Sequence, residues 1–534
     1  MGYRRRRTSE VVRLHLWARL RVRAGARCRS ALFQCSSGIF FLVALSFTSC
    51  ARPQEEPTGS GAELRIGVPE GNADGTELGV GQLAKNLTLE ALTQISAEGR
   101  ALPRLAESWT WEDNGRRLRL RLRAGVVLHD GRQFDAQTAA EVLGREIAQK
   151  GNHDSYPTLA DVRSATADGK LDLVFELAKE SPQLPVDLTV LLPVPAGPFQ
   201  IAKEEKNTIE LTRFDRYYQG VPSIARITIR SFDALRTSWA SLLRGELDMV
   251  YDVPVDAVDF VRNDDIDIVS VPRWYQHQLI FNAHDARFKS PLVRKALNLA
   301  VDRAAIITRV LDEAGAPSSG PIYPTYWAFD TSVPNYAYDP VSAASLLDAA
   351  GFRMPATSGV AAPPARLRFT CLLPRDFTIW ERIALEVQKD LFNVGVDMQF
   401  KVVPLEEFTN LVFSGRFEGA FVNMISGPTP SRSYMWWRSA RRFKGLYNVF
   451  GYENPHAEDL FEVLMRSSNE AAVRAATSKL QRALYEDPPA LYVAWDTRTR
   501  AIHRRFVLPK DERDPVWALW KWTLASAERV ALAQ

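Results

Sequence analysis

One short segment of the sequence, which contains Arg432, Tyr434, Trp436 and Trp437, places a guanidinium close to three aromatic rings. An arginine can hold an anionic group, and neighbouring tryptophan rings can stack on a sugar or another flat ligand. The alternative is that the rings pack in the core and the arginine lies at the surface. The segment is therefore a candidate binding site that competes with a structural interpretation.

Residue patterns that indicate catalysis or a bound metal are missing from the sequence. It has no glycine-rich phosphate loop, no cysteine pair at zinc spacing, no Gly-x-Ser-x-Gly and no His-Glu-x-x-His. Its seven histidines form no pair at the spacing of metal ligands. Cys371 lies in the apolar run 367–373, which is typical of a buried, unreactive thiol. We therefore expect no catalytic residue, no metal ligand and no cofactor, and hence no enzyme.

The elements that must position these side chains alternate between strands and helices, which predicts an α/β fold with mixed sheets. The predicted helices span 79–95, 136–149, 232–245, 291–312, 341–350, 377–393 and 470–485. The predicted strands span 64–68, 116–123, 266–271, 278–281, 366–373, 397–403, 419–424, 491–495 and 516–522. Arginine alternates with leucine in 116–123, which predicts one buried face and one solvated basic face.

The N-terminal segment has the features of an export signal. Ten arginines precede the uncharged run 38–49, and this run is too short for a membrane span, which needs about 20 residues. The small residues Thr48 and Ser49 lead into Cys50, which resembles the lipobox of bacterial lipoproteins, although Phe47 stands where leucine is preferred. We predict a signal peptide over 1–49, lipidation of Cys50 and a flexible tether over 50–62. The alternative is a buried apolar helix with an incidental cysteine.

The charge of the chain changes sign when this signal is removed. The full sequence has a formal net charge of +4, but ten of its 67 basic and one of its 63 acidic residues lie in 1–49. This leaves 57 basic and 62 acidic side chains in residues 50–534. With no basic stripe that interleaves aromatic residues, the sequence indicates no nucleic-acid partner.

Four groups of short motifs occur in order along residues 63–525. They are Leu105-Ala106-Glu107-Ser108-Trp109 with His129-Asp130-Gly131; Gly197-Pro198-Phe199 with Arg213-Phe214-Asp215-Arg216-Tyr217-Tyr218; the run from Val293 to Arg303 with Leu346-Leu347-Asp348-Ala349-Ala350-Gly351; and Gly451-Tyr452-Glu453-Asn454-Pro455. Each is weak alone, but the ordered set resembles the bacterial solute-binding proteins of the peptide/nickel/oligosaccharide class, extracellular family 5, which serve ABC importers.

The resemblance implies a two-lobed periplasmic-binding-protein fold of class II, large cluster C type, with an extra inserted subdomain. The lobes would close on a ligand about a hinge near 272–278 and 494–500. The implied division gives lobe I the residues 63–96, 196–275 and 494–534, the inserted subdomain 97–195, and lobe II 276–493.

The resemblance also implies a function. The protein would be a monomeric receptor that captures a small solute, which could be peptide-like, opine-like or an oligosaccharide, and delivers it to the permease subunits of an ABC importer. Together with the export signal, this predicts a periplasmic protein that is lipid-anchored to the cell membrane. Two alternatives stay open: a non-transport sensor or chaperone-like lipoprotein on this fold, and a nickel- or haem-binding member.

Further candidate ligand-binding residues follow from the cleft that the resemblance implies. They are Trp274, Tyr275 and His277 at the hinge, with Asn423, Ser426, Arg432, Tyr434 and Trp437 in the second lobe. For His277 a structural role and a nickel or haem role are both open. Peptide-binding members carry an aspartate that pairs with the peptide's amino terminus, and alignment on Pro430 puts Ser426 there. A buried ammonium without a carboxylate is costly, so we expect no binding of free peptide amino termini in the usual way.

Overall fold

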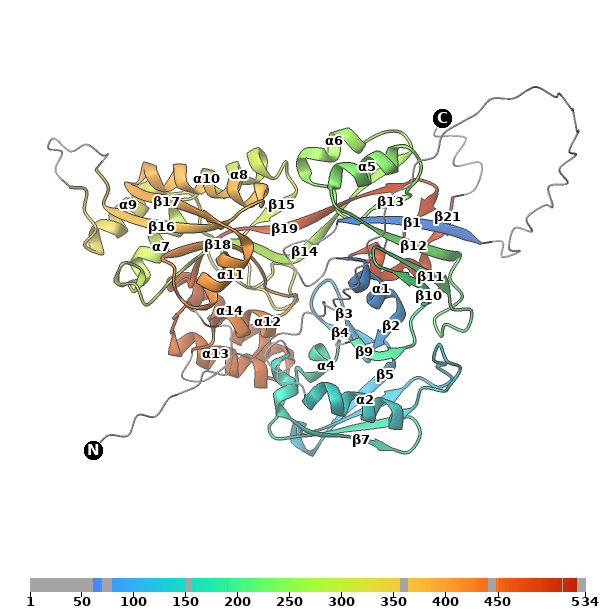
Figure 1. Cartoon of the computed structure of the whole chain (residues 1–534). Helices are drawn as coiled ribbons and strands as arrows, with labels where there is room; N and C mark the ends of the chain where they lie inside the picture. The colour runs from blue at the N-terminus through green and yellow to red at the C-terminus, as the bar shows by residue number, and fades with distance from the viewer. Residues whose placement is uncertain are drawn as a thin grey trace, which may run out of the picture. The chain divides into compact units, whose positions relative to one another are not determined.

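Two long strands, β14 (Ile266–Phe281) and β19 (Ala490–His503), pair with each other and join the two halves of an eleven-stranded sheet (Figure 1). The computed structural model describes residues 61–69, 79–148, 156–189, 191–355, 364–439, 448, 450–510 and 512–525. The strand order is β10-β11-β12-β1-β13-β19-β14-β18-β16-β17, and β15 (Gly315–Pro317) pairs with β19 outside this path. The predicted mixed α/β architecture is confirmed.

One half of the sheet is built around β1 (Ala62–Pro69), which runs parallel to both of its neighbours. Every second side chain of β1, at Leu64, Ile66 and Val68, is fully buried, as the alternation in the sequence predicts. The other strands of this half are β10 (Phe199–Glu205), β11 (Thr208–Arg213), β12 (Ile224–Phe232) and β13 (Met249–Val250). Its helices are α1 (Val80–Thr88), α5 (Leu235–Leu243) and α6 (Val258–Val261).

The other half of the sheet contains a parallel pair, β16 (Leu367–Pro374) and β17 (Val396–Val403), connected through α10 (Thr378–Asn393). The apolar residues of β16 and α10 pack together in the core of this half. The remaining elements of this half are β18 (Gly419–Ile425), α7 (Pro291–Leu299), α8 (Arg303–Val310), α9 (Pro340–Ala349), α11 (Leu405–Phe413), α12 (Pro430–Trp437), α13 (Pro455–Arg466) and α14 (Glu470–Glu486).

A separate four-stranded antiparallel sheet carries α2 (Ala136–Ala148) and has a hydrophobic core of its own. Its strands, in spatial order, are β5 (Ala106–Glu112), β6 (Arg117–Leu122), β8 (Asp172–Leu177) and β7 (Val162–Asp168). The leucines of β6 are fully buried, whereas Arg119 pairs with Glu112 and Asp168 on the outer face. The basic face is therefore a solvated sheet face, as predicted.

Short elements complete the described chain. They are β2 (Leu89–Ala91), β3 (Thr93–Ile95), β4 (Ala101–Pro103), η1 (Asp113–Gly115), η2 (Pro157–Asp161), α4 (Leu184–Asp187), β9 (Leu191–Pro195), η3 (Val255–Ala257), η4 (Ala286–Phe288), β20 (Phe506–Val507), η5 (Pro515–Lys521) and β21 (Thr523–Leu524). Strand pairs β2–β9, β3–β4 and β20–β21 form separate two-stranded sheets.

The strands predicted over 266–271 and 278–281 are one strand, β14, and three further predicted elements differ from the structure. The helix predicted over 291–312 divides into α7 and α8, because the Asp302 carboxylate accepts the backbone N–H of Ala305 and caps a new helix. The helix predicted over 79–95 ends at Thr88 and is followed by β2 and β3. The strand predicted over 516–522 is wrong: Val516, Leu519 and Trp522 are buried at a spacing of three, which is the period of the 3₁₀ helix η5.

Candidate functional site

The pairing of β14 with β19 is interrupted at the middle of the large sheet. Pro272 pairs with Thr497 and Gln276 pairs with Trp495, so three residues of β14 stand opposite the single residue Asp496. Such a bulge turns side chains out of the regular alternation. The interruption places Arg273 and Trp274 of β14 where the two halves of the sheet meet.

A buried ionic cluster occupies this interruption. The Asp496 carboxylate accepts a hydrogen bond from Nη1 of Arg273 at 2.8 Å and another from Nδ2 of Asn423 at 3.2 Å, and Nε2 of His277 lies 3.6 Å from its second oxygen. Burial disfavours the charged carboxylate, but the contacts with His277 and Arg273 outweigh it and hold the pKa of Asp496 well below its usual range. Asp496 is therefore ionised at neutral pH.

A pocket opens beside this cluster, and we call it the hinge pocket. It is lined by Val271, Pro272, Arg273, Trp274, Arg498, Arg513, Asp514 and Trp517. The guanidinium of Arg513 lies 3.7 Å from the centroid of the Trp274 ring and donates a hydrogen bond to the Pro272 carbonyl at 2.7 Å. β14, β19 and the segment before η5 thus each contribute an arginine to one pocket.

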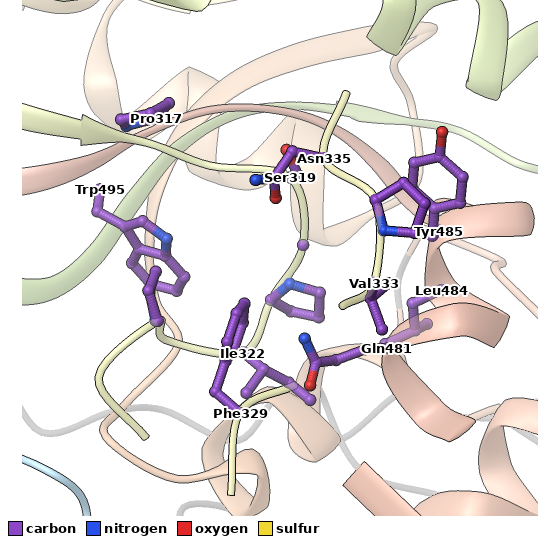
Figure 2. A pocket seen from close by; sticks show the side chains of 14 residues that line it. Pro317, Ser319, Ile322, Phe329, Val333, Asn335, Gln481, Leu484, Tyr485 and Trp495 are labelled. Carbon is purple, nitrogen blue, oxygen red and sulfur yellow. The ribbon is translucent and has the colours of Figure 1, made fainter. Parts of the chain in front are cut away.

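A second, larger pocket lies between the segment 317–335 and α14 (Figure 2). Figure 2 shows Trp495 on one side of it and Leu484 and Tyr485 on the other. Its lining is largely apolar and proline-rich, and the Gln481 side chain is already hydrogen-bonded to the backbone of Asp330. Apart from Trp495, every lining residue falls in 276–493, so a ligand here would contact one side of the hinge.

The comparisons with known proteins identify the family. Residues 100–444 match the family model described as bacterial extracellular solute-binding proteins, family 5, middle part. The chain belongs to this family. A curated relative, the oligopeptide-binding protein AppA of Bacillus subtilis, is 22% identical over 93% of this chain and 99% of its own length. The glutathione-binding protein GsiB of Escherichia coli is 22% identical over 72% of this chain and 78% of its own.

Solved structures share the fold. NikZ from Campylobacter jejuni, in complex with Ni(L-His), has a TM-score of 0.72 at 20% identity and covers 86% of this chain and 99% of its own. The structure of AgaA in complex with agropinic acid has a TM-score of 0.69 at 18% identity. The match covers 87% of this chain and 99% of AgaA. The two-lobed periplasmic-binding-protein fold is confirmed. This family 5 protein is the substrate-binding component of an ABC importer, and it acts outside the cytoplasm.

Four of the predicted site residues of this family 5 protein come together where the two halves of the large sheet meet. Trp274 lines the hinge pocket, and its carbonyl accepts the backbone N–H of Ser426 at 2.8 Å. His277 and Asn423 belong to the ionic cluster, and Asn423 Nδ2 lies 3.4 Å from both ring nitrogens of His277. Tyr275 is buried directly beside them, with the Arg273 guanidinium 4.2 Å from its ring centroid.

Three further predicted residues do not line the hinge pocket. Trp437 is 2% exposed and packs against aromatic rings of the same core cluster, and the Tyr434 hydroxyl donates to the Glu462 carboxylate. These contacts favour the interpretation that the rings of Tyr434 and Trp437 pack in the core. The guanidinium of Arg432 lies 4.3 Å from the ring centroid of Tyr156, which belongs to the segment predicted as the inserted subdomain.

The charged residues of the candidate site were not among the predicted site residues. Arg273, Asp496 and Arg498 fall in the two segments predicted as hinge crossings, and this position was the available signal. Arg513 had no such signal, because it lies in a loop whose partner is 239 positions away along the chain. Tertiary contact alone brings it to Trp274.

Metal-ligating groups, membrane-spanning helices and reactive cysteines are relevant to other functions. In the part of the chain that the structure describes, no group of three or more His, Cys, Asp or Glu side chains is arranged to hold a metal ion. None of the described helices combines the length and apolar character needed to cross a membrane. Cys371 is fully buried, and burial raises the pKa of its thiol, as expected of an unreactive cysteine. Cys50 and the predicted signal lie outside the described residues.

Proposed function

We propose that this protein is a lipid-anchored, monomeric receptor without enzymatic activity, which captures a small solute in the hinge pocket and presents it to the importer's permease. The observation that carries the proposal is the convergence of Arg273, Trp274 and Arg498 on one pocket from the two strands that join the halves of the sheet. Every residue that lines this pocket falls in the segments of the proposed lobe I, and Arg273, Trp274 and Arg498 stand in the two proposed hinge crossings. A ligand bound there therefore contacts the crossings that must bend as the lobes close. The ligands named with the AppA and AgaA structures support a peptide-like or opine-like solute.

The proposed division into lobes follows the hydrophobic clusters. Lobe I comprises 63–96, 196–275 and 494–534, the inserted subdomain 97–195, and lobe II 276–493. Three separate clusters of buried residues support this division, one centred on β1, one on β6 and one on β16. The crossings at 272–278 and 494–500 coincide with the interrupted pairing of β14 and β19, where a hinge has fewest ladder hydrogen bonds to disturb.

Contacts between the inserted subdomain and lobe II support a closed form. The backbone N–H of Trp327 donates to the Glu98 carbonyl at 3.0 Å, and the Arg100 guanidinium lies 4.2 Å from the Trp327 ring centroid. Arg100 also pairs with Glu470 at 2.7 Å. None of these residues belongs to the two hinge crossings, so these are contacts that a closed form makes and an open form loses.

The main test uses the solute that the protein itself selects. Full-length protein in mild detergent is incubated with yeast extract, and retained small molecules are identified by mass spectrometry. Trp274→Ala should reduce retention about tenfold, because loss of a buried aromatic contact is worth roughly 1.5 kcal/mol or more. The matched control is Phe260→Ala, an exposed ring outside the pocket. Equal retention by Trp274→Ala and the unaltered protein would exclude the hinge pocket as the binding site.

The lipid anchor has its own test. Cys50→Ala removes the thiol that would carry the lipid and should move the protein from the membrane fraction to the soluble fraction of the cell. An unchanged membrane fraction would contradict the anchor but not the solute-binding proposal.

Binding of free peptide amino termini through Ser426 is not part of the proposed function. Ser426 is 2% exposed, and its N–H and C=O are both engaged, by Trp274 and by Ser433. Calorimetry with a mixed library of di- to pentapeptides should give no heat that depends on a free amino terminus, so that N-acetylation leaves any affinity unchanged. Loss of micromolar binding on N-acetylation would contradict this expectation.

A further inference from the structure

The larger pocket, between the segment 317–335 and α14, has an uncharged lining, and we call it the α14 pocket (Figure 2). None of the 14 described residues that line it is Asp, Glu, Lys, Arg or His. The ammonium of Lys295 lies 4.7 Å from the Tyr485 ring centroid, but Lys295 is outside the lining and pairs with Glu486. A charged group placed in this pocket would find no counter-ion among the lining side chains, which is costly. The lining therefore favours an uncharged occupant.

Two carboxamides supply neutral hydrogen-bonding groups to the α14 pocket, one from α14 and one from the segment 317–335. The Gln481 side chain accepts the backbone N–H of Asp330 at 2.8 Å and donates to the Asp330 carbonyl at 3.2 Å, which fixes its orientation. A carboxamide carries two N–H donors, so Gln481 keeps one for a ligand. The Asn335 carboxamide lines the pocket from an exposed position and makes no hydrogen bond with the described residues. The two groups can pair with an amide or a carbonyl of a ligand.

The apolar walls of the α14 pocket are fixed by contacts of their own. The Gly320 carbonyl accepts a hydrogen bond from the Gln276 side chain at 2.8 Å. The Trp495 ring is 2% exposed and lies edge-on to Tyr323, with 4.8 Å between the ring centroids. Four lining residues are prolines, whose backbone has little freedom to lose: Pro317, Pro321, Pro324 and Pro334. A ligand would therefore bind a pocket that is already formed, which lowers the cost of binding.

We propose that the α14 pocket is a second binding site, which takes an uncharged molecule or group with a small apolar ring or chain next to an amide. The apolar part would lie between Trp495 and Leu484, which stand on opposite sides of the pocket (Figure 2), and the amide would pair with Gln481 and Asn335. No residue lines both this pocket and the hinge pocket, so the proposal goes beyond the proposed function and does not depend on it. Two sources share this chemistry: an uncharged end of the imported solute, and a separate small molecule.

Three probes of nearly the same shape test the preference for an uncharged group. The amide para-fluorobenzamide is neutral, para-fluorobenzoate is an anion and para-fluorobenzamidine is a cation. Each is titrated with full-length protein in mild detergent, and fluorine NMR line broadening measures binding against a blank of detergent alone. The amide should bind about tenfold more tightly than either ion, because the lining side chains offer no counter-ion.

Two variants assign the amide probe to the α14 pocket. Val333→Phe adds a ring to a buried lining side chain and should remove binding of the amide. The matched control Val341→Phe makes the same change at a side chain that is 76% exposed and outside the pocket, and it should leave binding unchanged. Asn335→Leu keeps the size of the side chain and removes its carboxamide, which should weaken binding about fivefold. Because Asn335 is exposed, this variant tests the site even if thermal melting shows that Val333→Phe does not fold.

Yeast extract distinguishes the two sources of the occupant. Retained small molecules are quantified by mass spectrometry for Val333→Phe and for the unaltered protein. Lower retention by Val333→Phe of the compound whose retention depends on Trp274 supports the site and assigns its occupant to the imported solute. Full retention of that compound, together with loss of the amide probe, supports the site and assigns its occupant to a second small molecule.

The outcomes that overturn the proposal are separate from those that concern the hinge pocket. Equal affinity for the amide and the two ions overturns the proposed ligand class. No binding of the amide, or an affinity that neither Val333→Phe nor Asn335→Leu changes, overturns the site. Retention of nothing from yeast extract contradicts the proposed function and leaves the result with the amide probe as it stands.

Discussion

At the scale of single residues, buried charges determine how this protein is assembled around its hinge. Arg303 is an example away from the site: burial lowers the pKa of its guanidinium to about 10, and backbone carbonyls of Ser318, Tyr492 and Asn298 surround it. A buried cation of this kind ties several segments to one point, because each carbonyl must stay in place to solvate it. A charged residue in apolar surroundings is therefore a candidate for a structural role as well as for ligand binding.

Asp187 should make stability depend on pH. Burial raises the pKa of its carboxyl to about 6, despite hydrogen bonds from Thr158 and the nearby Arg432. The folded protein thus keeps a proton that the unfolded chain releases from about pH 4 upward, so this residue makes the free energy of unfolding fall by about 3 kcal/mol as pH rises from 4 to 6. Asp187→Asn keeps a side-chain oxygen that can accept the hydrogen bonds of Thr158. Because asparagine does not titrate, this variant should not show the fall in the free energy of unfolding.

Urea denaturation at several pH values between 4 and 7 measures the effect. The stabilisation by Asp187→Asn should grow with pH over this window. Asp130→Asn provides a control, because the N–H and guanidinium of Arg132 lower the pKa of that exposed carboxyl, so its substitution should change stability by nearly the same amount at every pH in this window. Parallel pH curves for Asp187→Asn and the unaltered protein would contradict the prediction.

The pair formed by Arg500 and Asp514 should be one of the strongest single contributions to stability. Both side chains are buried, with exposed fractions of 0% and 6%. Asp514→Ala leaves the arginine buried without its counter-ion, which typically lowers the free energy of unfolding by about 3–5 kcal/mol. The exposed pair of Arg504 and Asp267 is the matched control, and Asp267→Ala should cost less than about 1 kcal/mol. Equal losses in chemical denaturation would contradict the argument.

At the scale of elements, the turn between β3 and β4 meets the loop after β18. Gly99 in this turn has a φ of 79°, and a Cβ added to it would lie 2.4 Å from the Pro428 carbonyl oxygen. Gly125 has a similar φ of 76°, but a Cβ added there would have no neighbouring atom within 4 Å. Substitution by alanine would therefore strain the backbone equally at the two glycines. Only at Gly99 would the added methyl group also clash with a neighbouring atom.

Gly99→Ala should weaken solute binding without a matching loss of fold. The added methyl group prevents close approach of Gly99 and Pro428, so the closed form loses part of its population and the apparent affinity falls with it. Gly125→Ala should lose a similar amount of stability, about 1 kcal/mol, and keep its affinity. Thermal melting and solute titration of the two variants side by side check this, and equal affinities would show that this contact does not form in the bound state.

At the scale of the whole molecule, an ionic contact joins α13 to the small four-stranded sheet region. The Arg466 guanidinium pairs with Asp161 and donates to the Glu180 carbonyl and the Ser181 hydroxyl, each at 2.8 Å. Arg466 lies in the proposed lobe II and its partners in the proposed inserted subdomain. These bonds are made only when the two are in contact, so they contribute to closure and not to the fold of either part.

Arg466→Ala should lower solute affinity by about tenfold, since hydrogen bonds to a charged group are worth about 1.5–3 kcal/mol. Thermal stability of the solute-free protein should change little. Arg482→Ala is the matched control, because that arginine pairs with Asp330 within the proposed lobe II. Small-angle X-ray scattering with saturating solute should show a larger radius of gyration for Arg466→Ala alone. An unchanged radius and affinity would exclude a role in closure.

The sequence by itself determined the α/β class, most element positions and the family, because these depend on short-range periodicity and on ordered local motifs such as Val293–Arg303. The hinge crossings at 272–278 and 494–500 stay a prediction from the family resemblance. The sequence did not determine that Asp302 divides a helix or that Pro515–Lys521 is a 3₁₀ helix, since capping and burial at a spacing of three became apparent only in the packed chain.

The tertiary structure decided the composition of the candidate site. Local sequence favoured Tyr434 and Trp437, but their rings are buried in the interior, whereas Arg513 and Trp274, 239 positions apart, stack in the hinge pocket. Asp496 is ionised in the cluster because Arg273, His277 and Asn423 surround it. The physical reason is that a motif records which neighbours a residue has along the chain, whereas a binding pocket depends on which charges and rings the folded chain brings within a few ångströms of one another.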